Sequence, residues 1–145
     1  MIGDLTSSGP VPTLQAAMNF AGRRHQLLLN NIANISTPNY VQQDVSTRDF
    51  QSQLAEAVAE RRGRNGSAAG ELHLRANREV SQDATGRLVL TPMTTSDNIM
   101  FHDRNNRDLE SQMQSLVENG MVFRMAGDFL KARFDLLRSA ISERA

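Results

Sequence analysis

The sequence predicts a mainly α protein in which an N-terminal helix and a longer C-terminal helix pair as an antiparallel-type coiled coil. The first evidence for this fold is the spacing of apolar residues, which follows an unbroken heptad over 13–35 and again over 109–141. This is the spacing of helices that pack against each other. The second is composition: 39% apolar residues and a mean hydropathy of −0.44 allow only a modest core. Residues 41–102 have no sustained period and predict an irregular, loop-rich middle segment.

The N-terminal helix follows a segment, 1–12, that is rich in Gly, Pro, Ser and Thr and predicts a flexible arm. Thr13 is the expected N-cap, and Pro38 ends the helix because it disfavours helical geometry at the preceding residue. Residues 13–40 thus form the helix and its exit turn. The seam of this helix is expected to contain Leu14, Met18, Ala21, Leu28 and Ile32. His25 shares the seam and is expected to be packed there.

The middle segment carries three weaker signals. Residues 44–62 predict a short helix with Phe50, Leu54 and Val58 on one face. Residues 63–70, GRNGSAAG, predict a flexible linker. Leucines alternate with polar residues at 72–74 and at 88–90, and a turn signal lies between them at 83–86, which together predict a small β-hairpin.

The C-terminal helix is predicted over 106–143, within a segment 103–145 that forms one domain with 13–40. Its seam has two rows. The first is Leu109, Leu116, Phe123, Leu130 and Leu137; the second is Met113, Gly120, Gly127, Phe134 and Ile141. Each glycine inside a helix costs about 1 kcal/mol relative to Ala. Close approach of a partner helix at Gly120 and Gly127 is the expected compensation, and both glycines are assigned to the seam.

A further apolar stripe lies on the other side of the same helix, where we expect contacts between subunits. It consists of Val122, Met125, Phe129 and Leu136. The alternative is that the middle segment folds back and covers it. A ribbon of alternating charge runs between the apolar faces; its members are Arg124, Asp128, Lys131, Asp135 and Arg138.

The sequence offers no catalytic, cofactor-binding or metal-binding constellation. The absence of Cys excludes disulfides, thiol nucleophiles and zinc fingers, and the three His residues lack metal-ligand spacing. A formal net charge of zero argues against nucleic-acid binding. No stretch is long and apolar enough to span a membrane, and no secretory signal begins the chain. We therefore expect neither an enzyme nor a small-molecule binder.

One local motif is distinctive: a helix end rich in Asn, followed by Ser-Thr-Pro-Asn-Tyr. Its members are Asn30, Asn31, Asn34, Thr37, Pro38, Asn39 and Tyr40. Residues 29–40, LNNIANISTPNY, resemble the N-terminal signature of the bacterial flagellar axial proteins, the family of rod, hook and hook-associated proteins. Asn39 stands where that signature commonly has Gly. Parts of 105–141 resemble members that form the proximal rod of the basal body.

This resemblance implies a structural subunit of the proximal rod, the hollow drive shaft that transmits torque and conducts exported subunits. It implies a periplasmic location, reached through the flagellar type III export system without a cleavable signal peptide. The implied partners are copies of the chain, other rod proteins, the junction of the rod with the MS ring, and the export gate. A free monomer is expected to be poorly folded. The alternatives are another axial protein of the proximal rod, or a helical-hairpin adaptor using the same seams.

Overall fold

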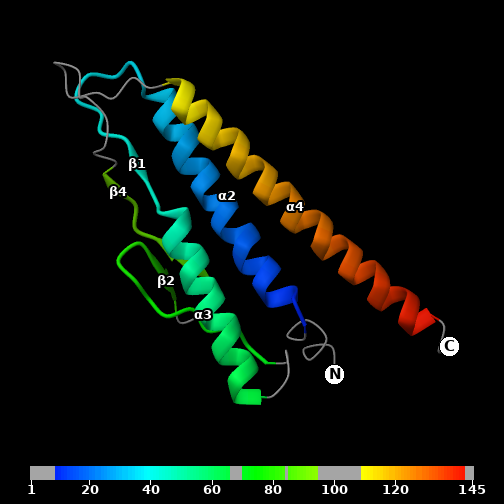
Figure 1. Cartoon of the computed structure of the whole chain (residues 1–145). Coiled ribbons are helices and arrows are strands. Elements are labelled where there is room, and N and C mark those ends of the chain that lie inside the picture. The colour runs from blue at the N-terminus through cyan, green and yellow to red at the C-terminus, as the bar shows by residue number, and fades with distance from the viewer. Residues whose placement is uncertain (1–8, 66–69, 84, 95–108, 143–145) are drawn as a thin grey trace.

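Three helices lying side by side form most of the molecule, which confirms the mainly α prediction (Figure 1). The computed structural model describes residues 9–65, 70–83, 85–94 and 109–142. The helices are α2 (Val11–Ala33), α3 (Thr47–Asn65) and α4 (Leu109–Ser142). Helix α2 lies between the other two, and α4 runs antiparallel to it, as the two seams predicted.

Helix α2 begins two residues before the predicted cap. Pro10 occupies the N-cap position and its carbonyl accepts a hydrogen bond from the Leu14 N–H at 3.0 Å. Thr13 is therefore already inside the helix, because proline is tolerated in a first turn and Pro12 does not delay the start. The start that the sequence predicts for the C-terminal helix, at residue 106, lies outside the described residues.

Helix α3 is longer at its C-terminal end than predicted. The Ser46 hydroxyl caps its start by accepting a hydrogen bond from the Asp49 N–H at 3.1 Å. The helix then continues through Gly63 to Asn65. The first three residues of the predicted linker 63–70 are thus helical, since a single glycine costs too little to end a helix.

A hairpin forms in the middle segment, as predicted, but its first strand lies at 80–82 and not at the predicted 72–74. Strand β2 (Val80–Gln82) pairs antiparallel with β3 (Leu88–Leu90). The turn at 83–86 is confirmed: the Gly86 N–H donates to the Asp83 carbonyl at 2.9 Å, and Gly86 has φ +77°. The hydrogen bond from the Thr85 hydroxyl, with that from the Arg87 N–H, lowers the pKa of Asp83.

A second two-stranded pair was not predicted. Strand β1 (Gln43–Asp44) pairs antiparallel with β4 (Met93–Thr94). Two residues are too few to leave a period in the sequence. A bidentate ion pair between Arg24 and Asp44, with N–O distances of 2.8 and 2.6 Å, attaches β1 to α2.

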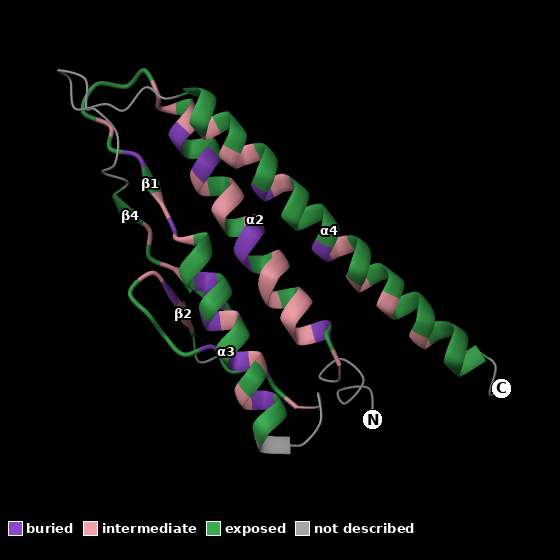
Figure 2. Cartoon of the chain, in the orientation of Figure 1, coloured by how far each residue is buried: buried purple, intermediate pink, exposed green. Residues whose placement is uncertain are grey.

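The hydrophobic core lies on the side of α2 that faces away from α4 (Figure 2). Its centre is the Phe20 ring of α2 stacked on the Phe50 ring of α3, with centroids 3.9 Å apart. The buried core residues are Phe20, Val45, Phe50, Ala57, Leu72, Leu74, Val80 and Leu88. None belongs to α4. The middle segment therefore has a core of its own with α2, and this core does not cover the predicted stripe on α4.

Candidate functional site

The α2–α4 seam is the first part of the candidate site. The buried Asn119 side chain donates a hydrogen bond to the Ala21 carbonyl at 2.7 Å. One turn further along α4, Phe123 lies against Gly22, where an added Cβ would be 3.3 Å from its ring. Asn119 and Ala126 are the buried residues of α4. This close contact fixes which face of α4 meets α2.

The seam contains one of the two rows predicted on α4. Leu116, Leu130 and Leu137 are half-buried there, on the same row as Phe123. The other row is rotated by one residue from the prediction and consists of Gln112, Asn119, Ala126 and Arg133. Polar residues dominate it, so hydrophobic spacing could not find it. On α2, Ala21 and Leu28 are buried, whereas Leu14, Met18, His25 and Ile32 are half-buried.

The expectation that α2 closely approaches the two glycines of α4 is wrong. A Cβ added at Gly120 or Gly127 would meet nothing within 4 Å among the described residues. Leu109, at the first turn of α4, is 48% exposed and contributes little to the seam. The second predicted row thus flanks the seam, with Met113, Phe134 and Ile141 exposed.

The predicted subunit stripe is also uncovered. Met125, Phe129 and Leu136 are more than half exposed, at 54%, 56% and 58%, and Val122 is 42% exposed. Figure 2 shows α4 as mostly exposed along its length. Exposed apolar side chains of α4 therefore lie on both sides of its seam with α2, which is unusual for a helix of a protein that acts alone.

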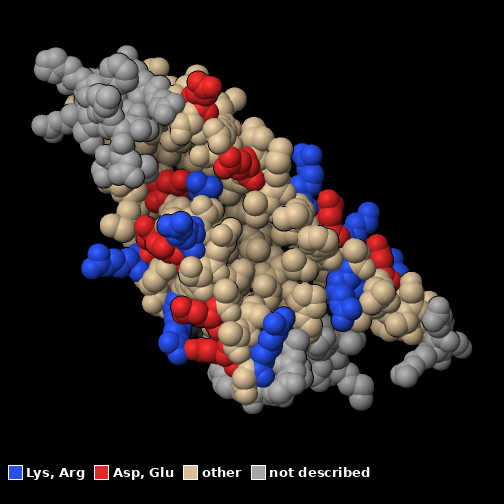
Figure 3. Space-filling model, viewed as in Figure 1, with Lys and Arg blue, Asp and Glu red and all other residues tan. Residues whose placement is uncertain are grey.

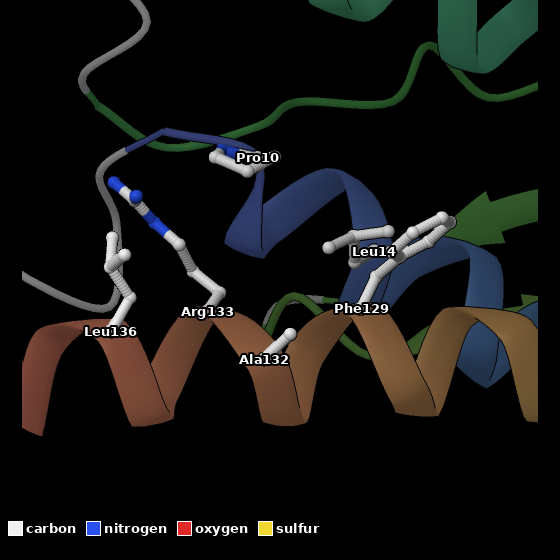
Figure 4. A pocket seen from close by; sticks show the side chains of 6 residues that line it. All are labelled: Pro10, Leu14, Phe129, Ala132, Arg133 and Leu136. Carbon is white, nitrogen blue, oxygen red and sulfur yellow. The ribbon is translucent and has the colours of Figure 1, made fainter.

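Part of the stripe forms an apolar groove with the start of α2 (Figure 4). Phe129, Ala132, Arg133 and Leu136 of α4 line it on one side, and Pro10 and Leu14 line it on the other. Its volume is about 420 Å³, which is enough for one or two large apolar side chains. Among the described residues that line it, Arg133 is the only charged one.

The Asn-rich turn is the second part of the candidate site, and Asn31 is its centre. The Asn31 side chain is 1% exposed. Its oxygen accepts hydrogen bonds from the Tyr40 hydroxyl at 3.0 Å and the Gln43 N–H at 3.1 Å. Its amide donates to the Gln43 carbonyl at 2.8 Å and to Gln112 of α4 at 3.4 Å. One side chain thus connects α2, β1 and α4.

The rest of the turn forms a local network. Asn34 donates to the Asn30 carbonyl at 2.9 Å and so caps the end of α2. Thr37 donates to Asn34, and exposed Pro38 leads to Asn39, which has φ +61°. After Gly, Asn is the residue that tolerates this left-handed conformation best, and residue 39 is the position where the axial-protein signature commonly has Gly. Asn30 donates to the Tyr40 hydroxyl at 3.3 Å, and partial burial raises the pKa of Tyr40.

Apart from Arg133, the charged side chains of α4 among the described residues are exposed. The five residues of the predicted ribbon are all exposed, and acidic and basic side chains alternate along the helix in Figure 3. No helix in the described residues is long and apolar enough to cross a membrane. Within the same ranges, no group of three His, Asp or Glu side chains is placed to hold a metal ion.

Comparison with known proteins identifies the family. No family model matches the chain. It is 30% identical over 104 residues to the flagellar basal body rod protein FlgB of Borrelia hermsii, covering 69% of this chain and 71% of that protein. It is 29% identical over 132 residues to FlgB of Salmonella typhimurium, covering 86% of this chain and 89% of that protein. It is 24% identical over 138 residues to FlgB of Bacillus subtilis, covering 93% of this chain and 95% of that protein. The chain therefore belongs to the FlgB family of flagellar basal body rod proteins.

Proposed function

We propose that the chain is a structural subunit of the proximal rod, where it contributes to the hollow drive shaft that transmits torque and conducts exported subunits. The relatives named above are flagellar basal body rod proteins. The observation that carries the proposal is the exposed apolar stripe of α4, with Met125, Phe129 and Leu136 more than half in solvent. Such a surface requires cover from neighbouring subunits. No catalysis and no cofactor are part of this role.

The seam supplies the mechanical unit of the proposed subunit. We assign residues 13–40 and 103–145 to one rod-forming domain, because α2 and α4 pack antiparallel and Asn119 fixes their register through the Ala21 carbonyl. Asn31 attaches the middle segment, 41–102, to both helices. This arrangement supports transmission of force between the rod-forming helices and the middle segment.

The proposed location is the periplasmic part of the basal body. We expect the chain to reach it through the flagellar type III export system, without a cleavable signal peptide. The expected partners are copies of the chain, other rod proteins, the rod–MS ring junction and the export gate. The likeness of the turn at 29–40 to the axial-protein signature supports these expectations, as does membership of the FlgB family.

Phe129→Asp tests the proposal in the native bacterium. A charge in the stripe is costly to bury in an assembled rod, but Phe129 is 56% exposed in the monomer, so the variant is expected to fold. We expect motility in soft agar to be lost while the flagellar export of other substrates into the medium continues.

The control is Val89→Asp, which introduces the same charge at a 39% exposed apolar residue of the hairpin. It is expected to leave motility close to the wild-type level. Normal swarming by Phe129→Asp would remove the assigned role of the stripe. A discrete soluble oligomer by light scattering, with normal motility in both variants, would favour the adaptor alternative.

A further inference from the structure

The sequence contains two Asn-Gly pairs, Asn65–Gly66 and Asn119–Gly120. An asparagine that precedes glycine is prone to deamidation, because the backbone nitrogen of the glycine can reach the asparagine side chain without hindrance from a Cβ. The second pair lies in the α2–α4 seam, where the Asn119 side chain fixes the register of the two helices through its hydrogen bond to Ala21. The chemistry of this pair is therefore connected to the packing of α4.

The closed seam keeps the two reacting groups of Asn119–Gly120 apart. Asn119 is 3% exposed, and its side-chain amide donates a hydrogen bond to the Ala21 carbonyl at 2.7 Å. The Gly120 nitrogen lies inside α4, where its N–H takes part in the backbone hydrogen bonding of the helix. Attack requires the Gly120 nitrogen to leave the helical backbone and the Asn119 amide to leave the Ala21 carbonyl. Both conditions are met only when α4 opens at this point.

Two features lower the cost of opening α4 at this pair. A Cβ at Gly120 would meet nothing within 4 Å among the described residues, so no close contact requires a glycine there. That glycine, and Gly127 two turns later, each weaken the helix by about 1 kcal/mol relative to Ala. In addition, no residue of α4 belongs to the core around Phe20 and Phe50. Opening of α4 therefore leaves that core in place.

We propose that Asn119 is a deamidation site whose rate is set by the opening of α4. In the opened segment, the Gly120 nitrogen bonds to the side-chain carbonyl carbon of Asn119 and loses its proton, and the amide nitrogen leaves as ammonia. Water then opens the resulting five-membered imide at either carbonyl, which gives aspartate or isoaspartate. In sum, one water is consumed and one ammonia is released.

The product cannot restore the contact that Asn119 makes. An aspartate carboxylate has no N–H to donate to the Ala21 carbonyl, and it places a negative charge at a position that is 3% exposed. Isoaspartate also adds one carbon atom to the main chain, which interrupts the hydrogen-bond pattern of an α-helix. A chain whose α4 stays open is thus converted into one whose seam no longer closes as before, whereas a closed seam preserves its asparagine.

Peptide mass spectrometry of the full chain measures the conversion during incubation at mildly alkaline pH. Trypsin releases Asn119 in peptide 108–124 and Asn65 in peptide 65–75, and neither peptide contains another Asn. In urea, both asparagines are expected to convert at similar rates, whereas in native buffer Asn119 is expected to convert much more slowly than in urea. Gly120→Ala is expected to slow the conversion of Asn119 in urea as well, because its Cβ hinders the attack where no helix remains.

Two neighbouring substitutions test whether opening of the seam sets the rate. Leu116 is half-buried in the seam, whereas Val117 is 52% exposed. In native buffer, Leu116→Ala is expected to accelerate the conversion of Asn119 on the order of tenfold, which corresponds to about 1.4 kcal/mol on the opening equilibrium. Val117→Ala is expected not to accelerate it, and neither change should alter the rate at Asn65. Circular dichroism first establishes that both variants keep the wild-type helical signal; if Leu116→Ala does not, Leu116→Val replaces it.

Equal conversion of Asn119 in native buffer and in urea overturns the proposal, because the seam would then give no protection. An unchanged rate in the folded Leu116 variant overturns it as well. The effect of the product is tested with Asn119→Asp, and Asn19→Asp is the same change at an exposed position of α2. Hydrogen exchange is expected to show reduced protection of α4 in Asn119→Asp and not in Asn19→Asp. Wild-type protection in Asn119→Asp would show that the deamidated seam still closes.

Discussion

Asn31 shows how a single buried side chain can fix the exit of a helix. Its carboxamide pairs with both the N–H and the carbonyl of Gln43, as a neighbouring strand would. The Tyr40 hydroxyl and Gln112 supply its remaining contacts. The direction of the chain after α2 is therefore set by side-chain hydrogen bonds, since no apolar residue of the turn at 36–40 is buried.

Asn31→Ala is expected to destabilise the chain by about 2 kcal/mol, because it removes the hydrogen bonds that the buried Asn31 carboxamide makes with the N–H and the carbonyl of Gln43. Urea unfolding of dilute protein, followed by circular dichroism, measures this as a lower midpoint with an unchanged slope. Asn19→Ala is the control: it is the same change on the same helix at an exposed position, and should remain within about 0.5 kcal/mol of wild type. Equal effects of both changes would show that Asn31 is not the centre of the turn.

The helices illustrate what hydrophobic spacing could and could not predict. It predicted the three helices α2, α3 and α4, the antiparallel pairing of α2 with α4, and the bulky seam row containing Leu116 and Phe123. It could not predict the other row, because Asn119 enters the seam through a hydrogen bond to Ala21 and Ala126 is buried by its small size. A count of apolar periods gives such residues no weight. The row of Met113 and Gly120 was selected instead because its members are apolar or small.

The middle segment was harder to predict for a related reason. The turn at 83–86 was found because Asp83 and Gly86 have strong local preferences. The β1–β4 pair was missed because the contacts that position it come from another element. Arg24 of α2 forms an ion pair with Asp44, and Asn31 of α2 donates a hydrogen bond to the Gln43 carbonyl. The core around Phe20 and Phe50 likewise joins segments 30 residues apart, and no local pattern shows which face of α2 the middle segment covers.

The open surroundings of the glycines in α4 lead to a second prediction. Gly120→Ala and Gly127→Ala are each expected to stabilise the isolated chain by up to about 1 kcal/mol, since the new methyl group meets nothing within 4 Å and Ala favours the helix. Gly22→Ala is the matched control, because its methyl group would lie 3.3 Å from Phe123 and must displace that ring. It should gain less than either change in α4. Thermal unfolding of the three variants compares them, and a loss of stability at Gly120 or Gly127 would indicate a close neighbour at that position.

At the scale of the whole molecule, the chain consists of a body built around a hydrophobic core and one helix, α4, that packs against α2 outside this core. The body contains α2, α3 and the hairpin around the Phe20–Phe50 stack. Helix α4 contributes no residue to this core, and Asn119 and Ala126 are its only buried residues among 109–142. The sequence alone predicts a poorly folded free monomer. The distribution of the core restricts that prediction to α4, because the middle segment has apolar cover of its own.

Hydrogen exchange of the dilute monomer tests this division. We expect the amides of α4 to open with a free energy well below that of α2 and α3, because only one face of α4 is packed and its seam is partly polar. Asn119→Ala should accelerate exchange in α4 further while leaving α3 unchanged, because the core around Phe50 does not involve Asn119. Equal protection of α4 and α3, or equal acceleration of both by Asn119→Ala, would show that the chain unfolds as one unit. Independent opening would support a role for assembly in ordering α4, because neighbours that cover its exposed apolar faces would supply the packing that the monomer lacks.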